Sequence, residues 1–331
     1  MFVKDKPLTL RGSSSLLYNN LAVLKNPEKG ITSYGVCHKS LVNIVSCGMS
    51  GATNHRQVIC HKDASSQSST VVMQAKWVKL STRTVLLLTT QRGVQMFEPD
   101  GSAMLYWHAL PDISAEDLQA CFVRGVAGAE TEDLATICVG NHKGDILVFE
   151  IPPKGINVSL LEVLQGHSSA ICDLASDGEL DGRVFSSDDS GAIVMWKAGE
   201  PFQQMLKISG AGSPCCSLAV WKNMVVGGYG SGHLRLYNTD TGNLAAEVTA
   251  HARWINAVDV AKNTGLLLSV SEDSFIRIWQ LKEGNSPEIS FVFGEAVTDL
   301  QLVGGCFNND DGISFVTTGY DNNDIVMFKQ A

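Results

Sequence analysis

Short apolar runs separated by turn residues recur along the whole chain. Six of them share one form, in which a turn rich in Gly, Asp or Asn leads into alternating residues that end on an aromatic side chain. Such alternation predicts half-buried strands, and the turn before it predicts a hairpin. The closing aromatics are Phe97, Phe149, Trp196, Tyr237, Trp279 and Phe328.

These aromatics lie 52, 47, 41, 42 and 49 residues apart, which indicates an internal repeat of small sheets with loop insertions. A fourth, outer strand is predicted after each of the first five aromatics. The predicted outer strands are Ala103 to Trp107, Val158 to Val163, Gln204 to Ile208, Leu244 to Val248 and Glu288 to Phe293.

The last sheet needs its outer strand from elsewhere, because the chain continues only three residues beyond Phe328. We expect Pro7 to Arg11 to supply it, since LTLRGSS there has the same form as EVLQGHSS at Glu162 to Ser169. This arrangement would join the two ends of the chain in one sheet and remove exposed sheet edges.

The rest of the first sixty residues predicts one further sheet. Its strands are Leu16 to Val23, Ile31 to Val36, Leu41 to Val45 and Gln57 to His61. Seven sheets result, with six or eight as alternatives because this sheet matches the repeat poorly. Ser46 to Thr70, rich in Ser, Asn, His and Gln, is predicted to be a flexible loop insertion.

The stretch from Ala250 to Gln280 carries a set of polar residues at particular spacings. Asp273, Ser269 and His251 precede Trp279 by six, ten and twenty-eight residues. A buried indole N–H needs an acceptor, and a buried imidazole needs a partner for each nitrogen. A hydroxyl can link the two rings while a carboxylate fixes the histidine tautomer. We therefore predict a structural hydrogen-bond network here.

A second set of residues resembles this network less completely. His167 and Ser186 have the matching positions relative to Trp196, but Ser190 stands where the carboxylate is expected, with two aspartates just before it. The other four aromatics lack an indole. The network is thus expected to be complete only in the later stretch.

The repeat and these spacings resemble the WD-repeat family, in which such a network staples the strands of one propeller blade. The resemblance implies an all-β, seven-bladed WD-repeat β-propeller over residues 1–331, its last blade completed by an N-terminal strand. It covers nearly the whole chain, and three stretches indicate one particular member of the family. They are LRGSSSLLYNNLAVL, RGVQMFEPDGSAMLYWHAL and GYGSGHLRLYNTDTGNLAAEVTAHAR.

The composition indicates which classes of partner and which cellular compartment are favoured. The chain is 44% apolar and 18% charged with a net charge of −9, and no basic stripe favours nucleic acid. No apolar run is long enough to cross a membrane. Its nine cysteines are scattered and odd in number, which favours inert thiols and predicts a cytoplasmic protein. A partner could still recruit such a protein to a membrane.

Catalysis, cofactors and metals are not expected. His251, Ser269 and Asp273 have the composition of a catalytic triad, but their spacing places them inside a sheet, where no substrate approaches. GGYGSG at 227–232 is followed by a strand rather than a helix, so it predicts a hairpin turn and not a phosphate site. The cysteines and histidines of the first sixty-one residues lack paired zinc-ligand spacing.

The resemblance implies that partners bind the top face of the propeller, which is built by the turns. The residues expected there are Arg11, Arg92, His142, Lys143, Tyr229, Arg253, Trp254, Glu272 and Tyr320. Trp254 beside Arg253 has the composition of an interface hot spot. The alternative is that Trp254 packs into a neighbouring blade.

We therefore predict a non-catalytic scaffold or adaptor that binds other proteins. A phosphoinositide-binding propeller is one alternative, but related lipid-binding members carry paired arginines where this chain has Arg92 alone. A ubiquitin-ligase substrate receptor is another, but neither Trp196 nor Trp279 is followed by Asp-x-Arg. Exposed outer strands are compatible with a homo-oligomer, although no heptad or long apolar stripe requires one.

Overall fold

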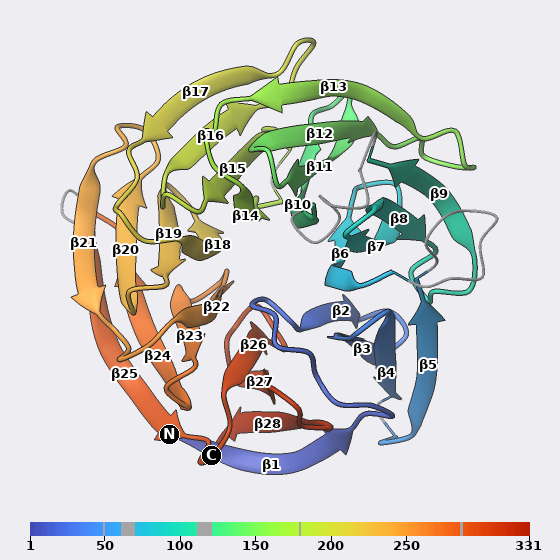
Figure 1. Ribbon diagram of the computed structural model, residues 1–331. Coiled ribbons are helices and arrows are strands. Elements are labelled where there is room, and N and C mark those ends of the chain that lie inside the picture. The colour runs from blue at the N-terminus through green and yellow to red at the C-terminus, as the bar shows by residue number, and fades with distance from the viewer. Residues whose placement is uncertain (49, 61–69, 111–120, 179, 285–286) are drawn as a thin grey trace. The chain divides into compact units, whose positions relative to one another are not determined.

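A computed structural model describes the chain except for residues 49, 61–69, 111–120, 179 and 285–286. Within the described residues all regular secondary structure is β-strand, arranged as seven four-stranded sheets. The all-β class and the seven-bladed β-propeller are therefore confirmed, with each sheet forming one blade (Figure 1).

Contacts between residues divide the chain into two compact units. Unit 1 comprises Met1–His38, Asn43–Arg56 and Cys216–Ala331, and unit 2 comprises Lys39–Val42 and Gln57–Cys215. Three whole blades lie in unit 2. Their strands are β6 (Val72–Lys79), β7 (Thr84–Thr90), β8 (Gly93–Phe97), β9 (Met104–Ala109), β10 (Val123–Glu130), β11 (Ala135–Asn141), β12 (Asp145–Glu150), β13 (Ser159–Gln165), β14 (Ile171–Ala175), β15 (Arg183–Asp188), β16 (Ile193–Lys197) and β17 (Gln203–Ile208).

The remaining four blades lie wholly or mostly in unit 1. Their strands are β2 (Ala22–Asn26), β3 (Ile31–His38), β4 (Leu41–Gly48), β5 (Thr53–Ile59), β18 (Cys215–Trp221), β19 (Met224–Tyr229), β20 (His233–Asn238), β21 (Leu244–Thr249), β22 (Ile255–Ala261), β23 (Leu266–Ser271), β24 (Phe275–Lys282), β25 (Glu288–Ala296), β26 (Leu302–Phe307), β27 (Ser314–Gly319), β28 (Asp324–Gln330) and β1 (Phe2–Thr9).

The apolar runs of the sequence become the middle strands of the blades. β19 and β23 are buried along their whole length, whereas β21 and β25 are mostly exposed. The middle strands are covered on both faces because neighbouring blades of a unit pack against each other. In unit 1, for example, Met224 and Leu236 of one blade share a core with Leu267 and Trp279 of the next. Burial on both faces explains why these strands are mostly apolar along their whole length rather than alternating.

A β-bulge recurs in the outer strand beside the blade aromatic. In the β24–β25 pair, Trp279 lies opposite Phe291 and Ile278 lies opposite Phe293, so Val292 has no direct partner. The β8–β9, β12–β13, β16–β17 and β20–β21 pairs shift at the same place. A bulge increases the local twist and interrupts a flat edge, which hinders edge-to-edge aggregation.

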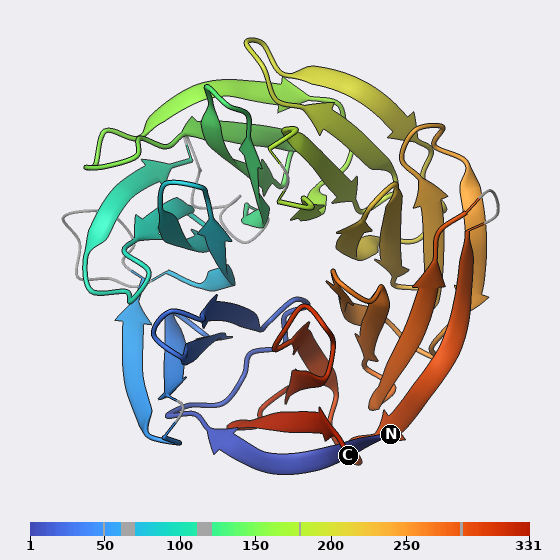
Figure 2. The same cartoon turned by 180° about the vertical axis from the view of Figure 1, so that it is seen from behind.

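The N-terminal strand completes the last blade, as predicted. β1 pairs antiparallel with β28, and both views show the two strands side by side (Figures 1 and 2). The strand covers Phe2–Thr9 rather than Pro7 to Arg11. It begins earlier than predicted because the buried side chain of Phe2 anchors its start in the core. Its ring is 5% exposed and lies 5.1 Å from the ring of Phe315 and 5.4 Å from that of Phe293.

The first blade differs from the prediction in two places. Its innermost strand is β2 at Ala22–Asn26, and not Leu16 to Val23. The outer strand β5 covers Thr53–Ile59 rather than Gln57 to His61, so the flexible loop predicted for Ser46 to Thr70 is wrong for these residues. An edge strand needs little apolar sequence because one of its sides faces solvent, so its polar composition resembled a loop. Residues 49 and 61–69 lie outside the described part of the chain.

The predicted network around Trp279 is confirmed. The indole Nε1 donates to Ser269 Oγ at 3.0 Å, and this hydroxyl lies 2.8 Å from His251 Nε2. His251 Nδ1 lies 3.1 Å from both carboxylate oxygens of Asp273. The distances define one chain of donors, from indole to hydroxyl to imidazole to carboxylate. It joins the loop before β22 to strands β23 and β24.

The network around Trp196 is also complete, so the prediction of a single complete network is wrong. Trp196 Nε1 donates to Ser186 Oγ at 2.8 Å, and His167 Nε2 lies 2.7 Å from the same hydroxyl. The carboxylate is that of Asp188, 2.7 Å from His167 Nδ1. It comes from the end of β15, two residues before Ser190, whose hydroxyl donates to the other carboxylate oxygen at 2.6 Å.

Both carboxylates are held in the charged form. Burial works to raise the pKa of Asp273, but the hydrogen bonds from His251 and from the Ala252 and Phe275 backbone N–H groups outweigh burial and hold the pKa below its usual range. The pKa of Asp188 is lowered in the same way against burial, through His167 and Ser190. Burial lowers the pKa of His251, although Asp273 opposes that shift.

Replacing Ser269 by Ala tests the network. Two buried groups, the Trp279 N–H and His251 Nε2, lose their shared partner, so we expect the free energy of unfolding to fall by about 2–4 kcal/mol. Chemical denaturation followed by tryptophan fluorescence measures this change. The control Ser290→Ala, at an exposed site on β25, should change it by less than about 0.5 kcal/mol.

Stability should also depend on pH. We expect the free energy of unfolding to fall as the pH drops through about 6.5, because the unfolded chain then takes up a proton at His251 that the folded protein resists. It falls again below about pH 4, where Asp273 and Asp188 are protonated only in the unfolded chain. Denaturation at a series of pH values measures both steps, and Asp273→Asn should make the lower step shallower. An unchanged lower step in that variant would contradict the assignment.

Replacing Phe2 by Ala tests the closure of the last blade. The substitution leaves a cavity beside Phe315 and Phe293, and we expect it to lower the free energy of unfolding by about 3 kcal/mol. Lys4→Ala on the same strand removes only a 3.7 Å surface ion pair with Glu295 and should cost less than about 1 kcal/mol. Equal effects of the two substitutions would argue against Phe2 as the anchor.

Candidate functional site

The turns at one end of the strands form the candidate site. In a four-stranded antiparallel blade, the hairpin between the second and third strands lies at the same end as the loop from the outer strand to the next blade. Arg11, Arg253, Trp254 and Tyr320 lie in such turns of unit 1, and Arg92, His142 and Lys143 lie in such turns of unit 2. We call the first four residues the unit 1 turn surface.

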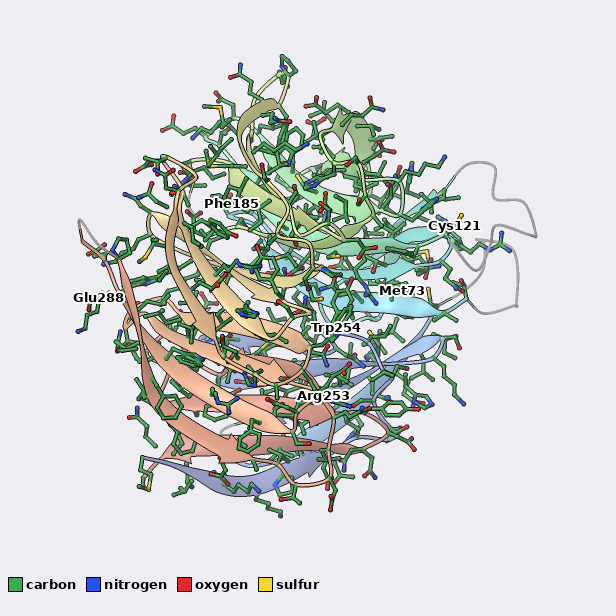
Figure 3. The ribbon with its side chains drawn as sticks, turned by 60° about the vertical axis from the view of Figure 1, so that its left-hand side comes forward. Met73, Cys121, Phe185, Arg253, Trp254 and Glu288 are labelled. Carbon is green, nitrogen blue, oxygen red and sulfur yellow. The ribbon has the colours of Figure 1, made fainter. Side chains whose placement is uncertain are left out.

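Trp254 combines exposure with a fixed position. Its side chain is 41% exposed in the loop between β21 and β22, where Figure 3 labels it. One face of the indole covers Gly230, since a Cβ on that glycine would lie 3.0–3.2 Å from three indole atoms. Its carbonyl accepts the backbone N–H of Glu272 at 3.1 Å. Trp254 thus packs on the neighbouring blade, as the alternative interpretation expected, while the rest of its ring faces solvent, and its role in binding a partner stays a prediction.

Arg253, the neighbour of Trp254, is exposed (Figure 3). Its carbonyl accepts the Ser271 hydroxyl at 3.3 Å, which anchors the backbone. Within the described residues no hydrogen bond or ion pair engages its guanidinium. His251, only two residues earlier, belongs to the buried network. The loop therefore carries an unpaired cation and an aromatic ring on a rigid support.

Arg11 and Tyr320 complete the unit 1 turn surface. Arg11 is exposed, and the Tyr320 side chain is 45% exposed. The Tyr320 backbone is held on both sides, by a bridge to Ser14 and by donation to the Gln301 carbonyl at 2.8 Å. The ring is therefore free for contact while its main chain is fixed.

Tyr229 does not belong to the surface, which corrects the sequence prediction. Its side chain is fully buried, with its hydroxyl 3.2 Å from that of Tyr237 and the Arg235 guanidinium 4.5 Å above its ring. Arg235 in turn is paired with Glu247. This blade has Tyr237 where the network blades have a tryptophan, and its hydroxyl pairs with that of Tyr229 under the Arg235 guanidinium. The buried position of Tyr229 could not be predicted from the sequence, because Tyr229 is part of a glycine-rich hairpin.

The predicted residues of unit 2 differ in their availability. Lys143 is exposed at the β11–β12 turn. His142 is half-buried and engaged, with Nδ1 3.3 Å from the Phe122 carbonyl and Nε2 3.5 Å from Cys121 Sγ. Arg92 is half-buried, and its backbone N–H donates to Thr90 Oγ1 at 2.9 Å.

The triad-like residues have no catalytic geometry. Ser269 is fully buried and His251 is 4% exposed. The hydroxyl is shared between an indole and an imidazole, and the other imidazole nitrogen is occupied by Asp273. A nucleophile needs access to substrate and donors for an oxyanion. The set therefore stabilises the blade and cannot attack a substrate in this arrangement.

Metal and phosphate chemistry find little support in the described residues. No group of three or more His, Cys, Asp or Glu side chains there could hold a metal ion. His38, part of the cluster considered from sequence, lies 2.7 Å from the Ser13 carbonyl, whereas His61 is outside the described part. The glycines of 227–232 serve close packing: a Cβ on Gly232 would lie 2.1 Å from the His251 carbonyl oxygen. The described residues contain no helix that could span a membrane.

Comparisons with known proteins bear on the family. The family model described as WDR54 matches residues 1–331. The chain is 40% identical to WD repeat domain 54 of Rattus norvegicus, 40% to WD repeat-containing protein 54 of Mus musculus and 38% to that of Homo sapiens. In each case the alignment covers 99% of both chains.

Solved structures share the fold at low identity. A chain in the crystal structure of the mitotic checkpoint complex has a TM-score of 0.75 at 16% identity, over 99% of this chain and 94% of that one. The RRP9 WD40 repeats have a TM-score of 0.71 at 15% identity, over 99% of this chain and 100% of that one. The full-length match to the family model and the 40% identity to its members show that the chain belongs to the WDR54 family of WD-repeat proteins.

Proposed function

We propose that this chain is a non-catalytic scaffold that binds partner proteins through the turns at one end of its blades, with Trp254 as the anchor. The observation that carries the proposal is the half-exposed indole held against Gly230 beside the free guanidinium of Arg253. Tryptophan and arginine are enriched at the energetic centres of interfaces. Because the indole is already fixed, little side-chain entropy is lost on binding.

The family supports a protein-interaction role in general terms. Propellers hold many variable loops on a rigid frame, which suits docking rather than chemistry. Seven of the nine cysteines are buried thiols, which supports the cytoplasm as the compartment. The acidic net charge disfavours direct binding to anionic lipids or nucleic acid.

Replacing Trp254 by Ala tests the anchor. We expect partners recovered by proximity labelling in cells to be lost, and the affinity of any purified partner to fall by about ten-fold or more. The melting temperature should change by less than about 3 °C, since the ring is half-exposed. Arg253→Ala tests a second residue of unit 1, and Arg92→Ala tests the turns of unit 2 in the same way. Met205→Ala, an exposed apolar site on the outer strand β17, is the control. Unchanged partner recovery in the Trp254 variant would refute the proposal.

Replacing Gly230 by Ala tests the seat of the anchor without removing the ring. A Cβ there meets three indole atoms, so the ring must leave its position and partner affinity should fall although Trp254 is present. Gly48→Ala is the matched control, because its Cβ would meet nothing closer than 4.0 Å. Crosslinking with mass spectrometry locates the contacted turns. Crosslinks confined to the outer strands would place the partner elsewhere and contradict the proposal.

A further inference from the structure

A second exposed aromatic lies away from the turns, on the outer strand of the blade that holds the complete Trp279 network. Phe291 on β25 is 60% exposed, the highest exposure of any aromatic side chain in the described part of the chain, and Val292 beside it is 50% exposed. Figure 1 shows β25 in orange as the outermost strand of its blade. Among the described residues no strand pairs with its outer edge.

The Phe291 ring is held in place despite its exposure. It meets the Trp279 ring edge-on at 5.6 Å, and Trp279 is fixed by its hydrogen bond to Ser269. Its tip leans over Gly294, where a Cβ would lie 3.2 Å from Phe291 Cζ. A large apolar ring that is exposed and yet packed against its neighbours suits an interface anchor, because ordering it costs little on binding.

The same face of the blade continues as an aromatic strip. Phe275 and Arg277 alternate with Trp279 along β24, so the three side chains share one face. Phe275 is 38% exposed, and the Arg277 guanidinium lies 4.9 Å above its ring. Their partners on β25 are Ala296, with only a methyl side chain, and Gly294, with none, so that strand leaves Phe275 and Arg277 uncovered. Phe291, Arg277 and Phe275 therefore form one continuous contact surface.

The charged residues around this surface favour a particular kind of binding partner. The apolar run Phe291 to Phe293 is flanked by Glu288 and Glu295, with side chains 66% and 34% exposed. Figure 3 labels Glu288 at the outer start of β25. Each carboxylate is only 3.7 Å from one lysine, at the outer limit of an ion pair. A partner segment with basic residues at its ends would meet a carboxylate at each end of the strand.

A second copy of the chain fits this edge poorly. Antiparallel pairing of two β25 strands about Val292 would set Glu288 opposite Ala296 and directly beside Glu295 of the other copy, at both ends of the pair. The repulsion between these neighbouring carboxylates disfavours the pairing. The edge is therefore arranged against self-association and open to a short strand of different sequence.

We propose that the β25 edge with Phe291 is a second protein-interaction surface, which binds an extended segment of a partner that carries basic residues at its ends and apolar residues between them. The segment adds as a strand to the free edge and packs an apolar side chain against Phe291. This surface is separate from the unit 1 turn surface, so either proposal can fail alone.

Peptide binding tests this surface directly. The probe is the fluorescein-labelled peptide Lys-Thr-Val-Thr-Val-Thr-Val-Thr-Lys, with a Glu-ended counterpart of the same core. In fluorescence polarisation we expect the Lys-ended peptide to bind the full chain about five-fold or more tightly than the Glu-ended one at low salt, with a smaller difference at high salt. Hydrogen exchange should slow at β25 amides when the peptide is bound.

Variants locate the binding and separate it from a structural effect. Phe291→Ala should weaken binding about ten-fold or more, and Phe291→Tyr should retain it. Leu244→Ala is the matched control: Leu244 is 51% exposed and lies opposite Tyr237 of its own blade, as Phe291 lies opposite Trp279, so binding should change by less than about two-fold. Trp254→Ala should leave peptide binding unchanged.

Three results would overturn the proposal. The first is that the wild-type chain binds neither peptide, and the second is that Phe291→Ala binds as tightly as wild type. The third is a dimer in analytical ultracentrifugation that Phe291→Ala abolishes, which would make a second copy the occupant.

Discussion

The hydroxyl of Ser269 links parts of the molecule that are distant in sequence. It accepts a hydrogen bond from the Trp279 indole N–H and lies within hydrogen-bond distance of His251 Nε2. It thereby connects β24, the third strand of the blade, to the loop that precedes β22, the first strand. The candidate surfaces depend on both ends of this link. His251 fixes the loop that presents Arg253 and Trp254, and Trp279 supports the exposed ring of Phe291. One buried polar chain thus positions two exposed aromatic side chains.

The outer strand of each four-stranded blade has an unpaired edge, which could pair with a strand of another chain. The bulge beside the blade aromatic hinders such pairing. Five outer strands bulge at the same register, so none of them offers a flat ladder. At this edge β25 differs from the others through its residues rather than its geometry. It places Phe291 at the position that Leu244 and Gln204 occupy on β21 and β17. A shared scaffold therefore carries one distinctive surface.

Blades without the network reach comparable burial by other contacts. In the β18–β21 blade, Tyr229 and Tyr237 join their hydroxyls under Arg235, and in the last blade Phe315 stacks on Phe328 at 4.8 Å. The last blade also depends on Phe2 from the other end of the chain. Such variation is tolerated because apolar packing between blades, rather than any one hydrogen bond, buries the middle strands.

The sequence alone determined the repeat, the all-β class and the strands, because apolar runs and turn residues act over a few neighbouring positions. It also identified the Trp279 network, whose spacings are fixed by strand length. It did not identify Asp188 as the second carboxylate, the buried position of Tyr229 or the start of the outer strand β5 at Thr53. Those depend on which side chains meet across strands. Only the tertiary structure decided that Trp254 packs on Gly230 and that Phe291 packs on Trp279, since each contact joins residues on different strands or turns.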